Sequence, residues 1–396
     1  MPSTSLCRCV SDHSRRTQER TRPDHPALTA LSLTDFRNYS ETRFTLSGHL
    51  AVFTGRNGAG KTNLLEAVSL LTPGRGLRRA AFADMARLGS TGLWAIAATV
   101  RHEAIETRLG TGLREAGERS RHVRINGATA PSAETLMDYV RLVWLTPSLD
   151  GLFTGAAGER RRFLDRLVLT LDPAHARRIV EFERLARSRN RLLGDGGDSQ
   201  WLDAVEAGLA ASAVAVSDAR ADTVARLGER IGAQAGLGAE FPVASLALAG
   251  AFEEKRAGRS AAEAEAAYLA MLRATRGRDH AAGRTLDGPH RSDLAVTFAE
   301  KEMPAALSST GEQKALLIGL VLAHADLVAH VSAVMPIVLL DEVAAHLDEG
   351  RRAALFDRLE GIGCQALITG TEPTLFASAH GRAEHFEVRD GAVRAL

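Results

Sequence analysis

The residues best suited to chemistry in this sequence form the stretch GRNGAGKT, which fits the phosphate-binding pattern GxxxxGK[ST] in full. Glycines let the backbone turn tightly and aim successive N–H groups at phosphate oxygens. The lysine brings a positive charge to the β- and γ-phosphates, and the last hydroxyl can hold Mg²⁺. We therefore predict a nucleoside triphosphate site built by Gly55, Arg56, Asn57, Gly58, Ala59, Gly60, Lys61 and Thr62.

The segments on either side of this loop agree with that interpretation. LAVFT, residues 50–54, is an apolar run of β-forming residues, and NLLEAVSLL, residues 63–71, is apolar at helical spacing. A strand, a glycine loop and a helix N-terminus together form an anion site, because free N–H groups and the helix dipole both favour negative charge. A plain glycine-rich turn is the other explanation in a chain with 36 glycines, but it leaves the flanking pattern unexplained.

A second stretch, MPIVLLDE, ends in two carboxylates. Its apolar run is too short for a typical helix and is typical of a buried central strand, whose carboxyl end is where ligands gather in α/β sheets. We predict that Asp341 holds Mg²⁺ and that Glu342 orients or deprotonates the attacking water, with Lys61 as the second catalytic residue. Taken alone, an ordinary strand that ends in solvated acids explains this stretch equally well.

A third stretch, SSTGEQKALLIGLVLAH, is predicted to be a turn followed by a helix. Ser309 and Glu312 fit the capping box S-x-x-E, so a plain capped helix is one explanation. The pattern SxGxQ[KR], about thirty residues before the two carboxylates, also resembles the signature element of ATP-binding-cassette (ABC) ATPases. That resemblance implies that Ser309, Gly311 and Gln313 address the γ-phosphate of ATP on an opposite subunit, and hence an ATP-dependent homodimer.

The stretch AHLD, which follows the carboxylates, is similar to the D-loop of the same superfamily and implies a role for His346 and Asp348. Two features of transporter ATPases are missing. The candidate Q-loop segment VWLTPSLD has no glutamine, and ALITGTEP has Thr369 or Thr371 where the switch histidine is usual. These departures count against the nucleotide-binding subunit of an ABC transporter and favour a DNA-repair branch.

Six phrases narrow the resemblance to the bacterial RecF family, over residues 28–396. The resemblance implies an SMC/Rad50-like ABC ATPase without a long coiled coil, in the cytoplasm. It further implies an ATP-driven dimer that binds DNA, a weak DNA-stimulated ATPase, and cooperation with RecR and RecO in loading recombinase at single-stranded gaps. The phrases, in family order and at roughly family spacing, are DFRNYSETRFTL, GRNGAGKTNLLEAV, GERRRFLDRL, LDPAHARRI, DGPHRSDL and SSTGEQKALL.

The hydrophobic pattern predicts an α/β fold, an ABC-type P-loop ATPase head with a mostly helical inserted second lobe. Residues 1–27 are polar and without periodicity, so we expect a disordered extension there. We place the head at residues 28–150 and 285–396, and the helical lobe at 151–284. Strands are predicted within 28–46 (two), 50–54, 93–100, 122–126, 140–146, 292–298, 336–342 and 364–370.

Charge is balanced overall, with a formal net charge of +1, but arginine is concentrated in one region. Between Gly158 and Arg191 there are ten arginines and five acidic residues. Such helices can make forked contacts to phosphates of duplex or junction DNA with little sequence reading, and an aromatic share of 5% argues against base stacking. The alternative is a solvated face with salt bridges to Glu181 and Glu183. The candidate DNA contacts are Arg160, Arg161, Arg162, Arg187, Arg189 and Arg191, with Arg78 and Arg79 as weaker ones.

The composition limits which other classes of protein the chain could belong to. A 396-residue chain that is 45% hydrophobic and 24% charged fits a soluble protein of two or three domains. We expect no membrane span, because no run of about 18 uncharged apolar residues occurs. Cys7, Cys9 and Cys364 lack the partners of a zinc site and fit a reducing cytoplasm. An ABC-headed nuclease would need an added acidic domain, for which we expect too little chain after CQALITG.

Overall fold

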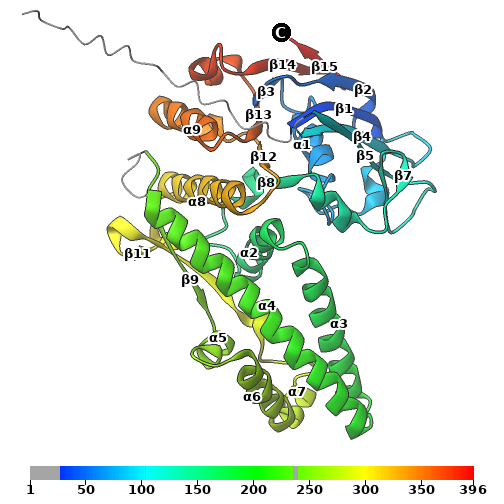
Figure 1. Cartoon of the computed structure of the whole chain (residues 1–396), viewed down its shortest axis with the longest axis vertical. Helices are drawn as coiled ribbons and strands as arrows, with labels where there is room; N and C mark the ends of the chain where they lie inside the picture. Colours follow the sequence, from blue (N-terminus) through cyan, green and yellow to red (C-terminus); the bar gives the residue numbers. More distant parts are fainter. Residues whose placement is uncertain (1–26, 103, 235–239) are drawn as a thin grey trace, which may run out of the picture.

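A computed structural model of the protein describes residues 27–102, 104–234 and 240–396. Figure 1 shows the two six-stranded sheets gathered in one lobe, which also holds the C-terminus, and a group of long helices that projects away from it together with β9. The predicted α/β head with a mostly helical inserted lobe is thus confirmed. The predicted extension, residues 1–27, lies outside the described residues except for Ala27, as do Cys7 and Cys9.

The phosphate loop and the two carboxylates belong to one sheet, whose strands lie in the order β15 (Ala392–Ala395), β14 (Glu384–Arg389), β3 (Leu50–Thr54), β13 (Gln365–Gly370), β12 (Pro336–Leu340) and β8 (Arg141–Leu145). All but β15 run parallel. Every residue of β3, β12 and β13 is buried, which is why their sequences are continuous apolar runs. Because β3 and β12 both flank β13, their carboxyl ends meet at one edge of the sheet.

A second sheet is antiparallel, with the order β2 (Tyr39–Thr45), β1 (Ala27–Phe36), β4 (Ala95–His102), β5 (Ile105–Gly112), β6 (His122–Ile125) and β7 (Ala128–Thr129). Its residues alternate between buried and exposed, as expected when only one face is covered. The covered face packs with helix α1 (Lys61–Ser69) in a shared apolar core that includes Leu31, Ile96 and Leu64. This packing joins the antiparallel sheet to the start of the phosphate-loop helix.

The helical lobe contains α2 (Ala157–Leu171), α3 (His175–Gly194), α4 (Ser199–Gln234), α5 (Ala251–Arg256), α6 (Ala261–Ala274) and α7 (Arg276–Ala281). One strand in this region was not predicted: β9 (Ala244–Ala249) pairs with β10 (Asp293–Phe298), which in turn pairs with the short β11 (Met303–Pro304). The predicted boundary after residue 284 therefore falls between two paired strands, so β10 is paired with a strand that lies inside the predicted helical lobe.

Helix α8 (Thr310–Val331) is the central core helix of the head, and α9 (Glu349–Ile362) packs beside it. Within the described part of the chain, α8 alone is long and apolar enough to cross a membrane by length and composition, with a mean hydropathy of 1.6. However, 72% of that segment is buried inside the protein, where it packs against α2, α4 and β12. The hydropathy of α8 is thus explained by its burial in the core.

Arg189 organises the interior of the helical lobe. Its side chain is fully buried and donates hydrogen bonds to Glu206 (2.9 Å), Asp279 (2.8 Å), the hydroxyl of Thr285 (2.9 Å) and the carbonyl of Leu272 (2.8 Å). A phosphate outside the protein cannot reach this guanidinium. The prediction that Arg189 contacts DNA is therefore wrong, because α3 turns this residue toward α4 and α6 instead of toward solvent.

Replacing Arg189 by glutamine should lower the free energy of unfolding by about 3 kcal/mol, because breaking a buried ion pair leaves an uncompensated charge. This loss of stability should be at the lower end of those seen when a buried ion pair is broken, since Arg276 still reaches Glu206 at 2.5 Å. Denaturant unfolding measures it. The matched change Arg191→Gln, at an exposed position on the same helix, should alter stability by less than about 0.5 kcal/mol. Equal losses in the two variants would contradict the assignment.

Candidate nucleotide-binding site

The phosphate loop enters α1 through Gly60, which has φ +114°. A Cβ atom at this position would also lie 2.6 Å from the amide nitrogen of Asn38 and 2.9 Å from the hydroxyl of Tyr39, so both conformation and space require glycine. Tyr39 donates to the carbonyl of Gly60 (3.0 Å), and Asn38 donates to the carbonyl of Ala59 (3.0 Å). The turn between β1 and β2 thus braces the loop from outside.

Lys61 is nearly buried, at 5% exposure. Its Nζ lies 2.8 Å from the carbonyl oxygen of Gly55 and 3.2 Å from that of Arg56. It also forms an ion pair of 3.1 Å with Oε1 of Glu342. The two predicted catalytic side chains are therefore in direct contact, although 281 positions separate them in the sequence.

Asp341 sits behind this pair and is held by two hydroxyl groups. Thr62 donates to its Oδ1 at 3.0 Å, and Thr369 donates to the same oxygen at 2.8 Å. Burial raises the pKa of Asp341, the two hydroxyl donors oppose that rise, and the neighbouring carboxylate of Glu342 adds to it. A hydroxyl and a carboxylate are hard oxygen donors, and Mg²⁺ takes only one or two protein oxygens beside phosphate and water. These residues therefore fit Mg²⁺.

Glu342 has an unusual backbone conformation, with φ +54°. This region costs free energy for a residue with a side chain and persists only where the surroundings hold it. Here the backbone N–H of Glu342 donates to the hydroxyl of Thr369 at 3.0 Å, the same hydroxyl that reaches Asp341. One threonine thus binds the carboxylate of Asp341 and the backbone of Glu342. In the sequence, Thr369 or Thr371 stands where a switch histidine is usual, and nothing there indicates this contact.

A cavity of about 470 Å³ opens beside the loop and gathers predicted residues from distant segments. Lys61 and Thr62 line it from the loop side, and Glu342 and His346 line it from the segment after β12. Asp348, the other predicted D-loop residue, instead caps α9 by accepting from the N–H of Arg351 at 2.8 Å. The full lining is Asn57, Gly58, Gly60, Lys61, Thr62, Asn63, Arg78, Glu342, Ala345, His346 and Thr371.

Arg78 lines this cavity, although the sequence indicated it as a weak DNA candidate. Its guanidinium donates to Asn63 (2.5 Å) and to Glu66 (3.1 Å). Glu66 is fully buried and also binds Arg37 through two hydrogen bonds, of 2.7 and 2.9 Å. Arg37 belongs to the phrase DFRNY, whose conformational role the sequence did not reveal. Two arginines therefore share one buried carboxylate beneath the nucleotide cavity.

Ser309 begins α8 with a complete capping box. Its hydroxyl accepts from the N–H of Glu312 at 3.4 Å, and the Glu312 carboxylate accepts from the N–H of Ser309 at 2.9 Å. Lys301, which donates to the same carboxylate, and Ser309 lower the pKa of Glu312 to about 2. Gln313 points inward and donates to the carbonyl of Ser308 at 2.8 Å. Neither Ser309 nor Gly311 lines the cavity of its own chain.

The predicted DNA arginines differ in their surroundings. Arg160 makes two 2.7 Å hydrogen bonds to Asp293, and Arg161 donates to the carbonyl of Ser292 at 2.7 Å, so both fasten α2 to the start of β10. Burial lowers the pKa of Arg161. Arg162 and Arg187 are exposed but pair with Glu159 (2.5 Å) and Glu183 (3.5 Å), whereas Arg191 is exposed on α3. The cluster is thus largely neutralised within the chain.

The parallel sheet, the phosphate loop, the paired carboxylates and the capped helix define a P-loop ATPase head of the ABC type. Residues 27–394 match the RecF/RecN/SMC N terminal domain family. The chain is 54% identical over 374 residues to the DNA replication and repair protein RecF of Rhizobium etli (strain CIAT 652), covering 94% of this chain and 99% of that protein. It therefore belongs to the RecF family of DNA replication and repair proteins, as the sequence analysis predicted.

Other comparisons agree. The RecF protein of Brucella suis biovar 1 (strain 1330) is 50% identical over 397 residues, covering 98% of this chain and 100% of that protein. A solved structure of the recombination mediator protein RecF-ATPrS in the RecFOR pathway has a TM-score of 0.84 at 20% identity, covering 95% of this chain and 99% of that chain. An Smc head from Pyrococcus furiosus has a TM-score of 0.52 at 16% identity, with 94% and 96% coverage. These likenesses support the SMC-head-like fold.

Proposed function

We propose that the protein binds ATP and Mg²⁺ in the phosphate-loop cavity, closes into a dimer over two nucleotides, and binds duplex or junction DNA in that form. The observation that carries this proposal is the incomplete wall of the cavity. Lys61, Thr62 and Glu342 line it, but Ser309 and the N-terminus of α8 do not. A second copy can supply that helix end, whose free N–H groups suit a γ-phosphate.

The residues of the cavity divide the chemistry of hydrolysis. The loop N–H groups and Lys61 hold the phosphates and stabilise the negative charge that spreads over them. Thr62 and Asp341 would hold Mg²⁺, which neutralises phosphate charge when bound. Glu342 orients the attacking water and accepts its proton. Because its carboxylate now pairs with Lys61 at 3.1 Å, phosphate oxygens would compete with Glu342 for the ammonium group.

Family membership supports the cellular role. The curated relatives are DNA replication and repair proteins, and we assign to this chain a cytoplasmic role in gap repair. ATP-driven closure would load the dimer on DNA, and slow DNA-stimulated hydrolysis would release it. RecR and RecO are the proposed partners in recombinase loading. The alternative of a transporter subunit is not retained, because the chain belongs to the RecF family.

Replacing Ser309 by alanine should weaken ATP-dependent dimerisation by about 100-fold or more while ATP still binds. Each dimer would lose two hydrogen bonds to charged phosphates, of about 1.5–3 kcal/mol each. Sedimentation with ATP, with ADP and without nucleotide measures the dimer, and equilibrium binding of a fluorescent ATP analogue measures the site.

The chain offers a matched control for the loss of the helix cap. Ser260 begins α6 with the same capping box, formed with Glu263. Ser260→Ala removes an equivalent cap, worth about 1 kcal/mol, from a helix remote from the cavity. It should leave dimerisation unchanged. If Ser309→Ala dimerised like the unmodified protein, or if both variants lost dimerisation equally, the role of Ser309 across subunits would be refuted.

A further inference from the structure

The outer face of the antiparallel sheet carries four exposed arginines, Arg43 on β2, Arg101 on β4, Arg108 on β5 and Arg124 on β6. Arg101 lies opposite Glu106, and we call the other three the sheet-face arginines. Strand register places them together. Arg43 pairs with Ser32, Ser32 with Ala97, Ala97 with Gly110 and Gly110 with Arg124, so one row crosses five strands and ends in arginine at both sides. Arg108 lies on β5 two residues before Gly110, and is thus a diagonal neighbour of Arg124.

The surroundings of these arginines differ from those of the predicted arginine cluster. Across residues 27–102, 104–234 and 240–396, we find no ion pair formed by any of the three. Arginines 160, 162, 177, 178, 184 and 187 of α2 and α3 each have an acidic partner. Charge that is already paired offers little to a phosphate, whereas an unpaired exposed guanidinium can form forked contacts at small cost.

The residues between the sheet-face arginines have unusually short side chains for an exposed sheet face. Open faces of antiparallel sheets normally carry large polar side chains, but here the row contains Ser32, Ala97 and Gly110. The fold does not demand glycine at position 110. An added Cβ would meet its nearest neighbours at 3.8 and 3.9 Å, which is ordinary contact, and the residue does not have positive φ. A glycine within a strand that is free of steric need is typical of a place where another backbone approaches closely.

We propose that this outer face is a DNA-binding surface, which the sheet-face arginines grip by the phosphate backbone. The proposal rests on the DNA-binding function proposed above and locates it on the head. Four strand spacings separate Arg43 from Arg124, about 19 Å, which exceeds the roughly 12 Å of a major groove. The two guanidinium groups can therefore reach phosphates on both sides of one groove of a duplex. The short side chains between them leave room for the DNA backbone to approach the sheet.

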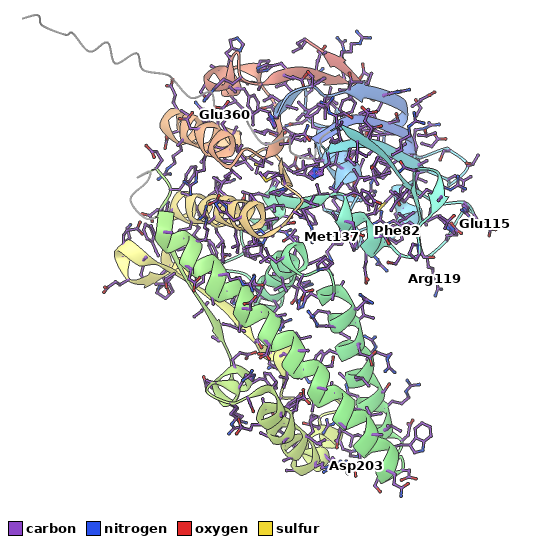
Figure 2. All side chains as sticks on the ribbon, in the orientation of Figure 1. Phe82, Glu115, Arg119, Met137, Asp203 and Glu360 are labelled. Carbon is purple, nitrogen blue, oxygen red and sulfur yellow. The ribbon has the colours of Figure 1, made fainter. Side chains whose placement is uncertain are left out.

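Charge complementarity favours DNA over a protein partner. The same face also carries Glu41 on β2 and Glu106 on β5, the latter opposite Arg101 in the strand register, so it is cationic without being uniformly so. Its small side chains include no large aromatic or aliphatic anchor of the kind that dominates protein interfaces. Figure 2 shows Arg119 and Glu115 projecting outward from the loop between β5 and β6, where opposite charges leave the rim close to neutral.

Removing the three positive charges should change the salt dependence of DNA binding. In the variant Arg43→Gln/Arg108→Gln/Arg124→Gln, the slope of log affinity against log salt should fall in magnitude by about 2.7, since each phosphate contact contributes about 0.9. Fluorescence anisotropy of a labelled duplex with ATP, at several salt concentrations, gives this slope. The matched control Arg226→Gln/Arg259→Gln/Arg284→Gln removes the same charge from exposed positions of the helical lobe and should leave the slope within about one contact of the unmodified value.

A second variant tests the role of the short side chains without changing the charge of the protein. Gly110→Thr suits a strand and should keep or raise the melting temperature, yet its side chain should weaken duplex binding at least several-fold. Unchanged DNA binding in both variants would overturn the proposal that this surface binds DNA. Equal losses of DNA binding in the triple variant and its control would overturn it too. These failures differ from failure of the proposed function, in which the unmodified protein itself would show no ATP-dependent dimerisation or DNA binding.

Discussion

Replacing Glu342 by glutamine should lower the rate of ATP hydrolysis by about 100- to 10,000-fold and leave ATP binding nearly intact. The amide keeps the size and position of the side chain but cannot accept a proton from the attacking water. The local structure would hold the amide in place, because the hydrogen bond from the N–H of residue 342 to Thr369 does not involve the side chain. The variant should therefore accumulate as a long-lived ATP dimer on DNA. Phosphate release, sedimentation and the dissociation rate from labelled duplex measure the three effects.

The control for this change is Glu372→Gln, which removes one exposed carboxylate from the loop after β13 without touching the cavity lining. Its hydrolysis rate should match that of the unmodified protein. Loss of ATP binding in Glu342→Gln would instead show that the pair between Lys61 and Glu342 holds the loop open for nucleotide. Hydrolysis at an unchanged rate would exclude Glu342 as the base that accepts the proton.

The two halves of the nucleotide site could be predicted because each is concentrated in a short stretch with a strong physical constraint. Phosphate chemistry requires the order of residues from Gly55 to Thr62, and a fully buried parallel strand requires the apolar run before Asp341. The rule that ligands gather at the carboxyl ends of such strands then predicts that the two stretches meet. The structure confirms that the two stretches meet, because the hydroxyl of Thr62 lies 3.0 Å from Oδ1 of Asp341.

The bracing contacts could not be predicted, because they depend on residues that are distant in sequence and ordinary in type. Tyr39 and Asn38 fasten the phosphate loop from the turn between β1 and β2, and Thr369 on β13 contacts the Asp341 carboxylate and the backbone N–H of Glu342. Nothing in the spacing of a tyrosine, an asparagine or a threonine indicates such a partner. Strand β9 was missed for a similar reason, since ASLALA is short and its role is set by pairing with β10.

The error over Arg189 had a signal in the sequence. Phe182, Leu185, Arg189 and Leu193 are all buried and recur at spacings of three and four, the stripe by which an amphipathic helix faces a core. Arg187 and Arg191 lie off that stripe and are exposed. The arginines of α3 therefore lie on different sides of the helix and do not form a single surface. An arginine placed on the apolar stripe of a helix predicts a buried ion network, which the structure contains in Glu206 and Asp279.

Replacing Lys61 by alanine should weaken ATP binding by about 100-fold or more, since it removes a charged hydrogen-bond donor worth about 3 kcal/mol. ATP-dependent dimerisation and DNA binding should be lost with it. The structure adds a second expectation. Because the Glu342 carboxylate would lose its only ion pair among the described residues, it would face incoming phosphates without a counter-charge and oppose them further. The double variant Lys61→Ala/Glu342→Gln should therefore bind ATP more tightly than Lys61→Ala alone.

Binding of a fluorescent ATP analogue to the four members of this cycle, the unmodified protein, the two single variants and the double variant, measures the coupling between the two residues. Lys255→Ala provides the control, because it removes a lysine of the helical lobe that is exposed and remote from the cavity. Equal ATP affinity in Lys61→Ala and the double variant would mean that Glu342 does not oppose the phosphates. If Lys61→Ala bound ATP as tightly as Lys255→Ala, the proposal that the phosphate loop binds ATP would be wrong.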